Sequence, residues 1–180
     1  MLNTLIYLDT PWGGVIAQGM AGSEGVEVDK LILSSTFMGH GEPLAEPLQA
    51  GYISRLDDIT SMSPKEFGRA RAKSMLASPP SEEIFQEVAK IASEVKKSGL
   101  LSACEVLNYS DTSPFLKGFT KPVLIITGCH DKIVLPTRST NMAAYIADAQ
   151  HIEFENSGHA AYLEEPSAYN AAIKKFLSNG

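Results

Sequence analysis

Cysteine, basic residues and long apolar runs are all scarce in this sequence. Its 180 residues include only Cys104 and Cys129, too few for a disulfide scaffold and without metal-ligand spacing. Fifteen Lys and Arg against 21 Asp and Glu give a net charge of −6, which argues against a nucleic-acid partner. No apolar run reaches the length of about 18 residues that spans a membrane, and Met1 to Asp9 lacks the basic start of a signal peptide. We therefore expect a cytoplasmic protein without membrane contact.

The composition that is present is that of one globular domain. Hydrophobic residues make up 44% and charged residues 20%, which excludes a disordered chain. No Gly-x-Gly-x-x-Gly follows an apolar run, and neither a P-loop nor a His/Cys cluster is found. The sequence therefore predicts no cofactor and no metal.

Short apolar runs alternate with helical patterns along both ends of the chain. Runs of this kind are typical of parallel strands that helices cover on both faces. The predicted strands are Leu5 to Leu8, Lys30 to Ser34, Pro122 to Thr127 and His151 to Phe154. The predicted helices are Val15 to Ala21 after Gly13-Gly14, Thr137 to Ala149 after Pro136, and Ser167 to Ser178 after Pro166. The fold class is thus α/β, with a mainly parallel sheet of about four strands and flanking helices.

The segment 37–119 has no strand pattern. It predicts three helices, at Leu48 to Ile59, Pro64 to Ala77 and Ser81 to Leu107. A helical insertion between two strands of a parallel sheet is expected to cover the carboxyl ends of the strands, where open α/β sheets bind ligands. We therefore predict a core of residues 1–36 and 120–180 and a helical cap of residues 37–119.

Two short motifs follow the last two predicted strands. Gly128-Cys-His-Asp131 comes after the third strand, and Gly158-His159 comes after the fourth. Each motif stands at a strand end and is followed by a helix that begins with proline, so the two together are more specific than either is alone. The residue types suit proton transfer, because a histidine can take up a proton near neutral pH while a carboxylate fixes its tautomer.

These motifs and their order resemble the C-terminal part of the α/β-hydrolase superfamily, in its capped branch of esterases, carbon–carbon bond hydrolases and dehalogenase-like enzymes. The resemblance implies that His159 is the catalytic base and Asp131 the acid that orients it. It also implies a small ester-like substrate beneath the cap. The other histidines are interpreted as structural; they are His40, His130 and His151.

The segment that should carry the nucleophile departs from the family pattern. The family has a strand, Gly-x-nucleophile-x-Gly and a helix of small residues. Alignment on Gly13-Gly14 places Pro11 at the nucleophile and Asp9 at the first glycine. Proline has no nucleophilic side chain, and its ring excludes the strained backbone of the elbow. An intact serine elbow is excluded.

Two interpretations of this segment remain open. Relatives with Asp-Trp-Gly-Gly use aspartate, so Asp9 is one candidate nucleophile, although Thr10 and Pro11 are inserted before Trp12. In the other interpretation the elbow is inactive and Pro11 merely begins the helix. If the chain is a hydrolase, the nucleophile is then either Asp9 or a water activated by His159. By the resemblance, the backbone N–H of Trp12 is the remaining oxyanion-hole donor. Thr10 is expected beside the site, and Ser34 and Ser35 are expected to line the pocket.

The first strand, Leu5 to Leu8, matches the fifth of the eight family strands, and the preceding ones are absent from the sequence. An apolar edge strand without Pro or Lys invites pairing. We therefore expect a homo-oligomer, or a partner chain that supplies the missing strands. The predicted function is weak hydrolysis of a small substrate. The alternative is an inactive binding module, or a fragment that needs a partner chain.

Overall fold

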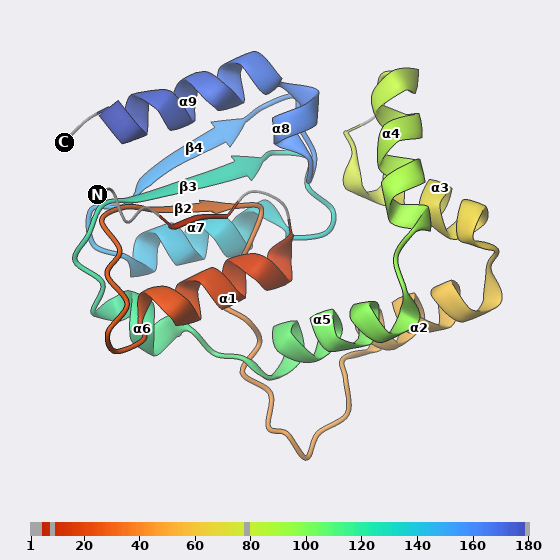
Figure 1. Ribbon diagram of the computed structural model, residues 1–180, viewed down its shortest axis with the longest axis horizontal. Helices are drawn as coiled ribbons and strands as arrows, with labels where there is room; N and C mark the ends of the chain where they lie inside the picture. Colours follow the sequence, from red (N-terminus) through yellow and green to blue (C-terminus); the bar gives the residue numbers. More distant parts are fainter. Residues whose placement is uncertain (1–4, 8–9, 78–79, 179–180) are drawn as a thin grey trace.

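The computed structural model describes residues 5–7, 10–77 and 80–178 (Figure 1). Its centre is a parallel sheet with the strand order β1-β2-β3-β4. The strands are β1 (Leu5–Tyr7), β2 (Leu31–Ser34), β3 (Val123–Gly128) and β4 (Gln150–Phe154). The predicted fold class is confirmed, and each strand lies within one residue of its predicted start.

Helices cover both faces of this sheet. Helices α1 (Pro11–Ala21) and α7 (Pro136–Tyr145) lie on one face, and α9 (Pro166–Ser178) lies on the other (Figure 1). Side chains of β2 and β3 alternate between the faces, because successive residues of a strand point to opposite sides. Those that pack with Met142 of α7 are Leu31, Leu33, Val123 and Ile125. Those that pack with Tyr169 and Phe176 of α9 are Ile32, Leu124 and Ile126.

Capping residues explain where two of the helices begin. Thr10 is the N-cap of α1, and its Oγ1 accepts the N–H of Gly13 at 3.4 Å, with Pro11 in the first helical position. Proline is favoured there because that N–H has no helical partner. The interpretation that Pro11 begins this helix is confirmed. Ser63 and Glu66 form a capping box at the start of α3 (Pro64–Met75).

Between β2 and β3 the chain is helical, as predicted. Besides α3, this segment contains α2 (Ala50–Ser61), α4 (Glu82–Ser93), α5 (Lys97–Tyr109) and the short α6 (Ser113–Lys117). Helices α2 to α5 lie beyond the carboxyl ends of the strands (Figure 1). The boundary between a core and a cap domain stays a prediction.

The prediction of a single helix over Ser81 to Leu107 is wrong. The chain breaks between α4 and α5, where Lys96 is extended at φ −93° and ψ 143°. The two helices pack against different partners. Val88 of α4 packs with Ala72 of α3, whereas Leu107 of α5 packs with Val15 of α1. A straight helix could not make both contacts.

Two smaller differences concern helix ends. Helix α7 ends at Tyr145 rather than at Ala149, because Ile146 turns to an extended conformation and enters the core. The short helices α6 and α8 (Ala161–Glu164) were not predicted, since one turn of helix carries no clear periodic pattern. In the described part of the chain, no helix is long and apolar enough to span a membrane.

Candidate active site

The structure brings His159 and Asp131 together. The Nδ1 of His159 lies 2.7 Å from Oδ2 of Asp131, and their side chains are 3% and 0% exposed. The other oxygen, Oδ1, accepts the N–H groups of Ile133 at 2.7 Å and Val134 at 2.9 Å. These bonds fix the carboxylate, and a carboxylate at Nδ1 holds the proton there, which leaves Nε2 as the basic atom.

The two loops that carry this pair are bonded to each other. Asp131 follows β3 and His159 follows β4, the neighbouring strand. The N–H of His130 donates to the carbonyl of Ser157 at 2.9 Å. A Cβ added to Gly128 would collide with the carbonyl oxygen of Gly158, so the loops approach as closely as glycine allows.

The backbone of His159 is held from two further sides. Its N–H donates to the carbonyl of Met75 at the end of α3, at 2.6 Å. Its carbonyl accepts the hydroxyl of Ser35 at 3.0 Å, and Ser35 has a positive φ of 47° directly after β2. The expectation that Ser34 and Ser35 line the pocket is not met, because neither contributes to the described cavity wall. The Ser35 hydroxyl instead fixes the histidine loop.

Glu164 is a positioning residue that was not predicted from the sequence. Its carboxylate accepts the N–H of Ala77 at 2.7 Å and the N–H of Gly158 at 2.8 Å. It thereby ties the end of the α3 segment to the loop of His159. The pKa of Glu164 is raised above its usual value, mainly because burial disfavours the charged carboxylate. The only signal in the sequence was the acidic pair before Pro166.

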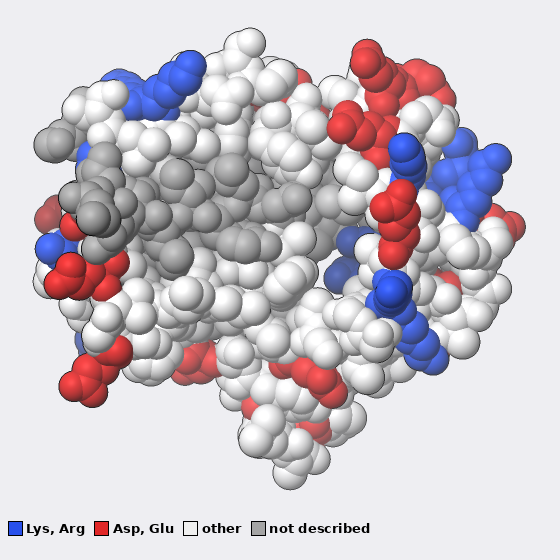
Figure 2. Space-filling model, viewed as in Figure 1, with Lys and Arg blue, Asp and Glu red and all other residues white. Residues whose placement is uncertain are grey.

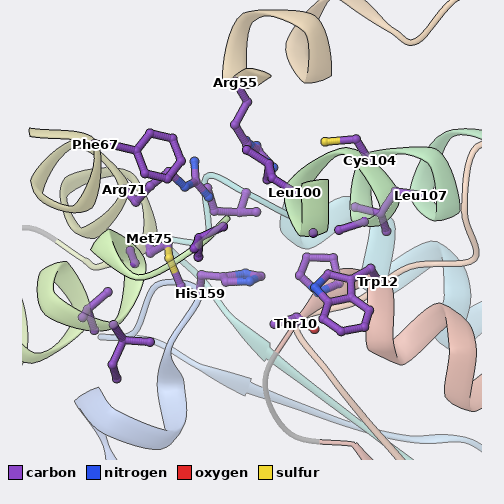
Figure 3. A pocket seen from close by; sticks show the side chains of 18 of the residues that line it. Thr10, Trp12, Arg55, Phe67, Arg71, Met75, Leu100, Cys104, Leu107 and His159 are labelled. Carbon is purple, nitrogen blue, oxygen red and sulfur yellow. The ribbon is translucent and has the colours of Figure 1, made fainter. Parts of the chain in front are cut away.

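His159 lies at a mainly apolar cavity of about 440 Å³ between the start of α1 and helices α2 to α5 (Figure 3). The wall includes Thr10, Pro11 and Trp12 from the start of α1. Most of the remaining wall is apolar and comes from the helical segment; it includes Phe67, Met75, Val88, Leu100 and Leu107. Small-molecule sites have this concave, apolar character with few polar groups.

The start of α1 borders the cavity but does not form a strained elbow. Thr10 has ordinary extended dihedral angles of −143° and 145°. Trp12 is in the first turn of the helix and is 39% exposed. First-turn N–H groups have no partner within their helix, so the Trp12 amide has the character that an oxyanion donor needs. Asp9, the other candidate nucleophile, lies outside the described residues.

Four polar residues of the cavity wall were not predicted. They are Arg55 of α2, Arg71 of α3, Cys104 of α5 and Tyr162 of α8. Burial raises the pKa of the Cys104 thiol, so the thiol stays protonated and is a poor nucleophile. Burial lowers the pKa of Arg71 to about 10, helped by the nearby charge of Arg55. No pattern in the sequence distinguishes these arginines from others on helix surfaces.

A parallel sheet with helices on both faces, and a histidine–carboxylate pair on loops after its last two strands, define the class of α/β hydrolases. Residues 12–166 match the family described as alpha/beta hydrolase fold, and the chain therefore belongs to this family. It is 28% identical, over 99% of its length and 68% of the relative's, to the AB hydrolase superfamily protein YisY of Bacillus subtilis.

Solved structures show the same fold. The chain is similar to the enol-lactonase from Burkholderia xenovorans, with a TM-score of 0.81, 20% identity and coverage of 98% of this chain. It is similar to the bromoperoxidase from Bacillus anthracis, with a TM-score of 0.84, 18% identity and coverage of 99%. It spans 65% of the enol-lactonase chain and 68% of the bromoperoxidase chain. At these identities the similarity shows the fold alone.

Proposed function

We propose that this chain hydrolyses small ester-like substrates, esters or lactones, with His159 as the general base. The observation that carries the proposal is the buried His159–Asp131 pair, which lies at an apolar cavity roofed by helices α2 to α5. This arrangement favours the capped branch of the family, in which a small substrate binds beneath helices.

In the proposed mechanism His159 acts through Nε2, since its Nδ1–H donates a hydrogen bond to Asp131. Nε2 takes a proton from a water molecule while the water oxygen bonds to the substrate carbonyl carbon. The N–H of Trp12, at the start of α1, stabilises the negative oxygen that develops. The carbon–oxygen bond of the leaving group then breaks, and protonated His159 returns its proton to the leaving alkoxide. The products are an acid and an alcohol.

Water is the nucleophile in this proposal because Pro11 cannot attack and the thiol of Cys104 is protonated. The hydroxyl oxygen of Thr10 is engaged as the N-cap of α1. Asp9 remains the other candidate from the sequence. A water-dependent route without a serine predicts slow turnover.

The purified chain is expected to release p-nitrophenol over many turnovers from p-nitrophenyl butyrate. The laurate ester should react more slowly, because its twelve-carbon acyl chain must fold, and lose conformational freedom, to lie within a cavity of about 440 Å³. Asp9→Asn decides the nucleophile: retained turnover indicates activated water, and abolished turnover indicates Asp9. A rate that equals the protein-free background for both esters would contradict the proposal.

The inactive binding module is the second candidate, and the observation that favours it is proline at the first position of α1. Such a module would bind ligands in the same cavity without turnover. The ester assay separates the two, because a binding module leaves p-nitrophenyl butyrate intact while the ester still competes with other cavity ligands.

We further propose that two copies of this chain associate at the β1 edge. β1 is the outermost strand on its side of the described sheet. Beside it, α1 exposes Trp12, Ile16 and Met20 at four-residue spacing, with exposed fractions of 39%, 42% and 46%. Edge strands and exposed apolar stripes of this kind are typical of interfaces.

Light scattering at tens of micromolar should therefore give a mass above the 19.4 kDa of one chain. Ile16→Glu is expected to lower the measured mass toward that of a monomer, because it places a charge in the apolar stripe. Leu44→Glu, which changes a residue 83% exposed on another segment, should leave the mass unchanged. A monodisperse wild-type monomer would exclude this association.

A further inference from the structure

Two guanidinium groups line the apolar cavity above His159. Arg55 extends from α2 and Arg71 from α3, and both side chains enter the space over the His159 imidazole (Figure 3). The space-filling view shows basic atoms deep in the hollow between the sheet and the helices α3 to α5 (Figure 2). Asp and Glu are absent from the described cavity wall.

Neither guanidinium has a carboxylate within ion-pair distance among the described residues. Among the described residues, the one contact within 4.0 Å between a basic and an acidic side chain is that of His159 with Asp131. The Nη1 of Arg71 donates to the hydroxyl of Ser74 at 3.3 Å, which is a neutral and long contact. Two like charges thus share an apolar space, with hydrophobic neighbours such as Phe67 and Met75.

This arrangement costs free energy, because a largely buried charge without a paired counter-charge is poorly solvated. The lowered pKa of Arg71, about 10, reflects the same burial and the repulsion by Arg55, which Asp58 and Cys104 offset only in part. Arg71 is still protonated at neutral pH. Arg69, on the same helix, instead lies 5.0 Å from the ring centre of Phe85, outside this cavity wall. Two arginines of one helix thus differ in their surroundings, and Arg69 serves as the matched arginine outside the cavity.

We propose that Arg71 and Arg55 bind a carboxylate of the substrate, so that the cavity selects esters or lactones that carry a second, free carboxylate. A guanidinium matches the planar, singly charged carboxylate through two parallel N–H···O bonds. The apolar wall between the arginines and His159 fits a hydrocarbon spacer. The anion site stands on its own, whereas its use in selecting a substrate rests on the proposed hydrolysis.

Calorimetric titration with hexanoate and its neutral isostere hexanamide tests the site. Wild type should bind hexanoate more tightly than hexanamide. Arg71→Met should weaken hexanoate roughly 10- to 100-fold, the loss expected for a hydrogen-bonded charge pair, and leave hexanamide unchanged. The matched variant Arg69→Met should bind both ligands as wild type does. Equal affinity of wild type for the two ligands, or equal losses in both variants, would overturn the proposal.

Two further measurements separate carboxylate binding from a folding defect and from general anion binding. Thermal unfolding checks that Arg71→Met is folded, and Arg55→Met provides the same titration if it is not. Inorganic phosphate is titrated as the competing anion. Displacement of hexanoate only by phosphate well above the hexanoate concentration supports a carboxylate site. Tighter binding of phosphate than of hexanoate would overturn it.

Kinetics then separate this inference from the proposed hydrolysis. The mono-p-nitrophenyl ester of adipic acid should have a lower KM than its methyl-capped, neutral analogue, and Arg71→Met should abolish that difference. His159→Ala should lose turnover and keep hexanoate binding. Carboxylate binding without turnover would overturn hydrolysis alone, and turnover of both esters with equal KM would overturn carboxylate selection alone.

Discussion

Replacing His159 with alanine is expected to lower the turnover of p-nitrophenyl butyrate by roughly 10²–10⁴-fold, the usual contribution of a general base. His159 is the only histidine of the described cavity wall, and its Nδ1 is bonded to Asp131 at 2.7 Å. Alanine leaves nothing at this place that can take a proton from water. Steady-state rates at saturating ester measure the loss in kcat.

Asp131→Asn provides the graded control for this prediction. Its carboxamide can donate to Nδ1, which favours the tautomer with the proton on Nε2 and removes the base. Its effect should not exceed that of His159→Ala, and the double variant should be no slower than His159→Ala, because the two residues act as a unit. His130→Ala, an exposed neighbour of the pair, should keep wild-type turnover. Equal rates for all four variants and wild type would contradict a role for the pair.

The pair was predictable from the sequence because two motifs at strand ends carry it. Apolar runs mark the parallel strands, and their carboxyl ends lie at one edge of the sheet. Gly-x-x-Asp after β3 and Gly-His after β4 resemble, in kind and in order, the motifs that hold the catalytic pair of α/β hydrolases. The structure brings Asp131 and His159 within hydrogen-bond distance.

The arginines of the cavity could not be predicted in this way. Their positions depend on how α3 packs against α4, on how α2 packs against α5, and on the break near Lys96 between α4 and α5. Arg69 and Arg71 are two residues apart on one helix, so they point in different directions, and only the packing decides which faces the cavity. The sequence pattern alone treats both as solvent-facing residues.

The role of Ser35 was missed for a related reason. The sequence places Ser35 at a strand end, where pocket residues are common. It does not indicate which way the hydroxyl points. In the structure, a positive φ of 47° turns the hydroxyl to the carbonyl of His159. Backbone strain of this kind depends on tertiary contacts and leaves no mark on local periodicity.

Replacing Gly128 with alanine is expected to destabilise the protein by about 2–4 kcal/mol, as overpacking against backbone does. An added Cβ would collide with the carbonyl of Gly158 and lie 2.6 Å from the carbonyl of Ser157. Backbone atoms cannot move aside as the end of a flexible side chain can. A loss of this size lowers the Tm by roughly 5–15 °C for a chain of this length, which thermal unfolding measures.

The matched substitution Gly19→Ala tests whether the collision is the cause. Gly19 lies within α1, and an added Cβ there meets nothing within 4 Å. Alanine should stabilise that helix by up to about 1 kcal/mol, since glycine is a poor helix former. Gly128→Ala should also lower ester turnover more than its unfolded fraction explains, because the displaced loop carries His159 away from Asp131. Equal Tm values for the two variants would show that the loops after β3 and β4 have room to separate, and the close fit of the catalytic pair would then need another cause.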